Sequence, residues 1–229
     1  MKKLSVTLSR KELLFGWVYL LLQLLALPFA ILFLDQAVGL QLSETELNFL
    51  LFAINFIVTT VLLRKLLLQG GVIALTNPGR TIGAVLRCFG LYWLGSLLVS
   101  FLIGAVDPEF YNVNDASIQQ MAAENYPLML IGTVILAPVA EELLYRGVIF
   151  GGISKTSRIL AYIVTCIAFS AIHVVGYIGM YEPIHLLLCL LQYIPPALVL
   201  CYAYVRADTI WAPIILHIVI NSIAMLATG

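Results

Sequence analysis

The stretch LMLIGTVILAPVAEELLYRGVIFGGI, residues 128–153, decides the fold. It is long and apolar enough to cross a bilayer, which takes about 20 residues, yet Glu141, Glu142 and Arg146 stand near its centre. Charged side chains within a membrane span are costly unless they are paired or hydrated, and by default they mark a functional site. The stretch therefore predicts a transmembrane helix that carries a polar site inside the membrane.

The rest of the chain has the composition of a polytopic membrane protein. Of its 229 residues, 62% are hydrophobic and only 10% are charged, with a mean hydropathy of +1.04. Its long apolar runs lie at 13–34, 47–63, 86–106, 127–153, 159–181, 184–205 and 209–228. The runs are continuous rather than alternating, which indicates helices. We predict an all-α bundle of seven or eight transmembrane helices, forming a single membrane domain over residues 1–229.

The charges outside the apolar runs predict the orientation. With the N-terminus in the cytoplasm, the cytoplasmic segments hold eleven of the twelve basic residues. The outer loops then hold no basic residue and eight acidic ones. This split follows the positive-inside rule, so we predict a cytoplasmic N-terminus. The formal net charge is zero, and no nucleic-acid partner is expected. The four cysteines form no Cys-x-x-Cys pair, so they predict neither a disulfide framework nor a thiolate metal site.

Six residues inside the predicted spans carry the candidate polar site, and their spacing separates their roles. Glu142 and Arg146 are four residues apart and share a helix face, so they can form an ion pair. Glu141 points about 100° away from Glu142 and lacks the arginine as a close partner. One carboxylate is therefore predicted to be structural, and the other is available as a general base.

The remaining polar residues lie on two other spans at similar depth. His217 and Asn221 are four residues apart, as are Phe169 and His173, so each pair faces one way from its helix. Pro138, three residues before Glu141, is expected to kink its helix and open space beside it. We expect these groups to converge on one wet cavity, with Phe169 shaping its floor.

Together these residues resemble a known protein family. Glu141-Glu142-x-x-x-Arg146, Phe169-x-x-x-His173 and His217-x-x-x-Asn221 are similar to the three-motif signature of the CAAX prenyl protease and bacteriocin-processing family, also called CPBP or Abi. The resemblance places a catalytic core at 127–225 and leaves 1–106 as additional spans without a recognisable motif.

The resemblance implies an intramembrane endopeptidase. Glu141 with His173 would activate the attacking water, and His217 with Asn221 would stabilise the tetrahedral oxyanion. Glu142 and Arg146 would brace the site. The expected partners are membrane lipid and a peptide or lipidated protein substrate. The short loops favour the plasma membrane of a bacterium, where a bacteriocin or pheromone leader is a natural substrate.

A zinc site is the alternative to a metal-free one. Glu141, His173 and His217 would supply three zinc ligands and leave one position open. The family has been described both as metalloendopeptidases and as glutamate-dependent proteases. The sequence has no His-Glu-x-x-His motif, and a histidine that donates to the oxyanion cannot also ligate zinc. We therefore expect no cofactor and keep zinc as the alternative.

Two other functional classes stay open. A non-catalytic bacteriocin-immunity or regulatory protein could share the fold. A transporter or proton relay would also carry buried glutamate and histidine, but would string them along the full depth of the bundle. In this sequence they cluster at one level, which favours a hydrolase.

Overall fold

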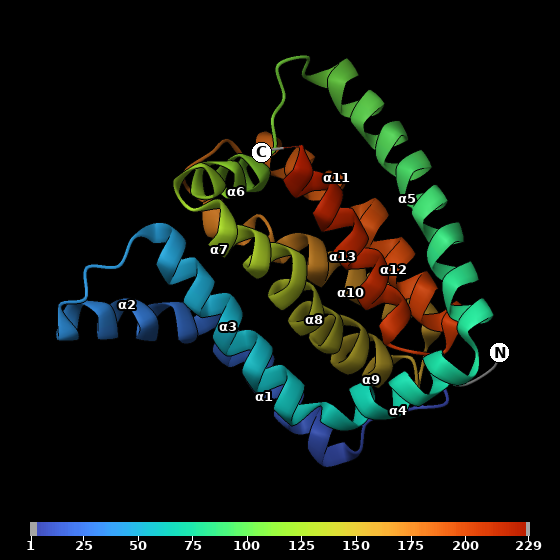
Figure 1. Cartoon of the computed structure of the whole chain (residues 1–229). Helices are drawn as coiled ribbons and strands as arrows, with labels where there is room; N and C mark the ends of the chain where they lie inside the picture. Colours follow the sequence, from blue (N-terminus) through green and yellow to red (C-terminus); the bar gives the residue numbers. More distant parts are fainter. Residues whose placement is uncertain (1–3, 228–229) are drawn as a thin grey trace.

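The computed structural model of the chain describes residues 4–227, and these form helices joined by short turns (Figure 1). Lys2 and Lys3, which entered the charge argument, and residue 228 of the last apolar run lie outside this range. No β-strand occurs among the described residues apart from an isolated bridge between Ile178 and Tyr181. The predicted all-α membrane fold is confirmed.

The first half of the chain contributes five helices. They are α1 (Arg10–Leu25), α2 (Leu27–Val38), α3 (Glu44–Leu62), α4 (Arg64–Thr76) and α5 (Pro78–Val106). Helices α1 and α2 meet at an angle of 52°, and α2 projects from the bundle in Figure 1. Ser9 and Ser43 each accept a hydrogen bond from the glutamate amide three residues on, so both α1 and α3 begin with a capping box.

The second half builds the centre of the bundle. Its elements are α6 (Val113–Glu124), α7 (Tyr126–Ile131), the π-helix η1 (Gly132–Leu136), α8 (Ala137–Glu142), the π-helix η2 (Leu143–Phe150), α9 (Gly151–Ile153), α10 (Arg158–Ile172), the 3₁₀ turn η3 (Val175–Tyr177), α11 (Pro183–Gln192), α12 (Ile194–Ala207) and α13 (Trp211–Leu226). From α7 to α9 the chain forms one helix, Tyr126–Ile153, which we call the central helix.

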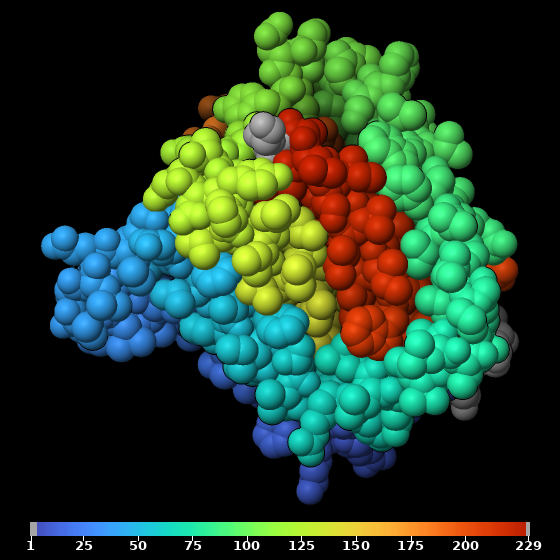
Figure 2. All heavy atoms as spheres, in the orientation of Figure 1, coloured from blue at the N-terminus to red at the C-terminus, as the bar shows by residue number. Residues whose placement is uncertain are grey.

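The central helix is the one that the others surround. Two-thirds (67%) of its most apolar window is buried, against 6% for α5 and 11% for α3. In Figure 2, α13 lies on the surface between this helix, in yellow, and α5, in green to teal. A helix enclosed by protein can carry charges that a lipid-facing helix cannot, because neighbouring helices supply their partners.

Within the described range, fewer helices are long enough to cross a membrane than the seven or eight spans that the sequence predicts. By length and composition, four qualify among the described residues, and the bent pair α1–α2 makes a fifth if it is one span. Helices α10 and α13 are apolar but have only 15 and 16 residues. At 1.5 Å per residue they are about 22–24 Å long. The count of seven or eight spans and the cytoplasmic N-terminus therefore stay predictions.

One predicted span is shorter than expected. The apolar run 159–181 forms a helix only as far as Ile172, and a 3₁₀ turn and a loop follow. Gly179 has a φ of +86°, a left-handed conformation that glycine adopts without a steric penalty. Apolar composition extends the run past the point where the backbone leaves the helix, so His173 lies at the end of α10 and not at its middle.

Candidate active site

The central helix changes register just before its two glutamates. In the π-helical segment η1, the amide of Ala137 donates to the carbonyl of Gly132, five residues back. Pro138 has no amide hydrogen, so the next π-type bond cannot form. The carbonyl of Thr133 therefore receives neither of these two backbone donors and is open to a side chain from another helix. This change of register also sets how α8 presents Glu141 and Glu142.

Glu142, Arg146 and His217 form a buried charged network. Arg146 Nη1 donates to Glu142 Oε1 at 2.8 Å, and both side chains have zero exposed area. His217 Nδ1 lies 2.8 Å from the same oxygen, so Glu142 joins the central helix to α13. Arg146 Nη2 also donates to the carbonyl of Ala197 in α12, at 3.2 Å. The predicted ion pair is present, and its link to His217 is an addition that the sequence did not indicate.

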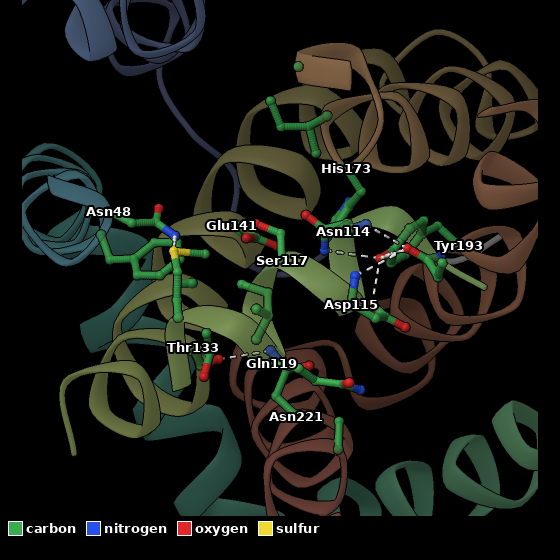
Figure 3. Close-up of a pocket in the computed structure, with 18 of the residues that line it drawn as sticks. Asn48, Asn114, Asp115, Ser117, Gln119, Thr133, Glu141, His173, Tyr193 and Asn221 are labelled. Carbon is green, nitrogen blue, oxygen red and sulfur yellow. Dashed lines mark hydrogen bonds between the residues drawn. The ribbon is translucent and has the colours of Figure 1, made fainter. Parts of the chain in front are cut away.

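Glu141 is placed differently from its neighbour. It lines a cavity of about 880 Å³, and 26% of its side chain is exposed (Figure 3). Its Oε2 atom is buried and has no hydrogen-bond partner among residues 4–227. This oxygen lies 4.0 Å from His217 Nε2. Glu141 is thus a cavity-facing carboxylate, as its helical position predicts.

His173 is held on one side by α10 and on the other by Tyr193, which lies between α11 and α12. Its Nδ1 lies 2.7 Å from the carbonyl of Phe169, so Nδ1 carries the hydrogen and Nε2 keeps its lone pair. The imidazole stacks on the ring of Tyr193, with 4.1 Å between centroids. Phe169 lies beneath the site with the guanidinium of Arg146 4.4 Å from its ring centroid. No ion pair joins His173 to Glu141 within the described range.

Asn221 supplies a hydrogen bond to the backbone carbonyl of Thr133 in the central helix. Its Nδ2 donates to the carbonyl of Thr133 at 2.8 Å, the bond drawn in Figure 3. An asparagine amide has two N–H groups, so this bond leaves one of them for another acceptor. Asn221 therefore joins α13 to the central helix and still faces the cavity that Glu141 lines.

Helix α6 contributes the polar side chains that the motifs did not identify. Tyr193 donates to Asp115 at 2.8 Å and accepts a hydrogen bond from Asn114 at 3.0 Å. Asn112, at the start of α6, donates to Gln192 at 2.7 Å. All of these residues line the cavity. Residues 107–126 are polar in sequence, but only the fold shows that they lie over the site.

The zinc alternative can be compared with this geometry. Across residues 4–227, no three His, Cys, Asp or Glu side chains are grouped so that they could hold a metal ion. His173 Nδ1 is engaged by a carbonyl and His217 Nδ1 by Glu142, which leaves Nε2 as the nitrogen of each that a metal could bind. In this conformation Glu141, His173 and His217 do not form such a group.

Comparison with known proteins shows which protein family this part of the chain resembles. Residues 123–223 match the family described as type II CAAX prenyl endopeptidase Rce1-like. The matched segment contains all seven residues of the three motifs. The resemblance inferred from those motifs is thus confirmed over this part of the chain.

One curated relative is more specific. "Putative membrane peptidase YdiL" from Bacillus subtilis (strain 168) is 30% identical over 101 residues. The match covers 44% of this chain and 37% of the relative, little more than a third of that protein's length. No solved structure matches the chain significantly. Both comparisons support a membrane location, and the family match begins only at residue 123.

Proposed function

We propose that this protein is an intramembrane endopeptidase in which Glu141 acts as the general base. The observation that carries the proposal is the contrast between two adjacent carboxylates. Glu142 is fully buried and its Oε1 atom is engaged by Arg146 and His217, whereas Glu141 lines the cavity with about a quarter (26%) of its side chain exposed. The family match and the similarity to a membrane peptidase support the same reading.

In the proposed reaction, Glu141 accepts a proton from water while the water oxygen bonds to the scissile carbonyl carbon. The Nε2 lone pair of His173 accepts a hydrogen bond from the other O–H of that water and orients it. When the tetrahedral intermediate collapses, the carbon–nitrogen bond breaks and Glu141 returns the proton to the leaving amine. Water is consumed, and no redox partner is needed.

His217 and Asn221 are the proposed donors to the oxyanion. The Nδ1–H of His217 is directed to the Glu142 carboxylate, so a donor at Nε2 requires the imidazolium form. A base and an oxyanion donor 4.0 Å apart can contact two oxygens bonded to the same carbon. The second N–H of Asn221 would complete the oxyanion hole.

The Asn221→Ala variant is expected to lower kcat by about 10²–10³-fold, the usual loss for one oxyanion donor. The measurement is steady-state cleavage of a fluorogenic peptide in detergent, with kcat and KM determined separately. Ser222→Ala is the matched control, because the Ser222 hydroxyl bonds only to the carbonyl of Ile218 in its own helix. If Asn221→Ala lowers the unfolding temperature and leaves kcat unchanged, the residue only joins two helices.

A metal-independent mechanism is proposed, and chelation tests it. Incubation with a zinc chelator followed by its removal is expected to leave cleavage unchanged, since the site residues do not form a three-ligand group. The rate is compared before and after treatment, and again after zinc is added back. Loss of activity to the chelator and its recovery with zinc would place both histidines in a metal shell and contradict the proposal.

We further propose a bacterial plasma membrane as the location, in line with the bacterial relative. The proposed substrate is a membrane-associated peptide or lipidated protein, such as a bacteriocin or pheromone leader, and membrane lipid is the other partner. Purified protein incubated with a peptide library that includes lipidated members tests this directly. If a well-folded protein cleaves no member, a non-catalytic immunity or regulatory role becomes the better reading.

A further inference from the structure

The cavity lies in one half of the bundle. Its lining residues fall at 44–52 in α3, at 92–100 in α5, at 133–141 in the central helix and from 217 onward in α13. Each set lies toward the helix end that is nearer to α6, and α6 itself supplies further lining residues such as Ser117 and Gln119. In Figure 1, α6 lies at one end of α5 and α4 at the other. The site therefore opens toward the α6 end.

The basic residues gather at the opposite end of the same helices. Within the described range, and apart from the buried Arg146, they are Arg10, Lys11, Arg64, Lys65, Arg80, Arg87, Lys155, Arg158 and Arg206, at the start of α1, α5 and α10, at the end of α12 and around the turns 63–64 and 154–157. None of them lines the cavity, whose charged lining residues are Glu44, Asp115 and Glu141. The protein thus has a basic end and an end that carries an acidic, open site.

We propose that the active-site cavity opens on the non-cytoplasmic face of the membrane, and that its substrate is a polypeptide segment exposed there. The inference rests on the proposed function for the substrate and on the positive-inside rule for the side. Because the cavity wall carries carboxylates and no lysine or arginine, the bound segment is neutral or basic around the scissile bond. An exported or membrane-anchored protein would present such a segment on the outer side of the membrane.

Three single-cysteine additions test the side without relying on activity. Gln119→Cys lies on the cavity wall in α6, Glu109→Cys lies at the same end outside the cavity, and Asn77→Cys lies at the basic end. All three positions are exposed, while the four native cysteines are buried, so the wild type measures background labelling. A charged, membrane-impermeant maleimide is applied to spheroplasts before and after permeabilisation.

The proposal expects Gln119→Cys and Glu109→Cys to be labelled in intact spheroplasts and Asn77→Cys only after permeabilisation. Labelling of Gln119→Cys should then abolish its cleavage of a library peptide, and labelling of Glu109→Cys should leave cleavage unchanged. If Asn77→Cys is the variant labelled from outside, the proposal is overturned whatever the cleavage assay shows. If labelling of Glu109→Cys inhibits cleavage as strongly, the cavity is not the route by which the substrate reaches the site. Correct labelling with no Glu141-dependent cleavage in the wild type would instead overturn the proposed function.

Discussion

The Glu141→Gln variant is expected to cleave peptide about 10²–10⁴-fold more slowly than the wild type, because an amide cannot accept the proton of the attacking water. Its unfolding temperature should stay close to that of the wild type, since the buried network is made by Glu142 and not by Glu141. The two measurements are initial cleavage rates and thermal unfolding followed by fluorescence-detected size exclusion in the same detergent.

Two control variants sharpen this prediction. Glu109→Gln removes a carboxylate that lies at the same end of the molecule but outside the cavity, and it should cleave at the wild-type rate. Glu142→Gln should unfold at a clearly lower temperature, because it loses the carboxylate that engages Arg146 and His217. If Glu142→Gln folds normally and is inactive while Glu141→Gln cleaves, the roles of the two glutamates are reversed.

The Arg146→Met variant is expected to lose about 3–5 kcal/mol of stability, the usual effect of leaving one member of a buried ion pair without its partner. Arg146 and Glu142 are both completely buried, so water cannot solvate the carboxylate that remains. Methionine keeps much of the side-chain volume, and the loss therefore reports the charge. Denaturant unfolding of the purified protein measures it.

The double variant Glu142→Gln/Arg146→Met separates charge from packing. It removes both charges, so it should recover part of the stability that Arg146→Met loses. Because His217 also contacts Glu142, full recovery is not expected. A double variant no more stable than Arg146→Met would mean that packing against Phe169 and the bond to Ala197, and not charge compensation, make Arg146 necessary.

Local spacing was enough to predict contacts within one helix. Glu142 and Arg146 are one turn apart, so their ion pair follows from the sequence alone, and so does the separate orientation of Glu141. The bond from His217 to Glu142 could not be predicted in this way, since it depends on how α13 is rotated against the central helix. Spacing also says nothing of the stack between His173 and Tyr193, which joins α10 to the helix pair α11–α12.

Backbone conformation accounts for most of the remaining differences between the predicted and the observed structure. Pro138 was expected to kink its helix, but the helix adopts a π-helical register before it, and the freed carbonyl of Thr133 is bound by Asn221. The span predicted from hydropathy at 159–181 extends past Ile172, where the helix ends. The apolar residues continue beyond that point although the chain turns at Gly176 and Gly179. Composition identifies apolar segments, whereas helix ends depend on local conformation.

The short lengths of α10 and α13 bear on how water reaches a site within a membrane. These two helices carry His173 and His217, yet at about 22–24 Å they are shorter than the roughly 30 Å hydrocarbon core of a bilayer. A bilayer accommodates such hydrophobic mismatch by thinning around the protein. Where α10 and α13 cross the bilayer, such thinning would draw the lipid boundary beside the histidines toward Glu141 and shorten the path of water to the proposed site. Acyl-chain length would then be a determinant of hydration there.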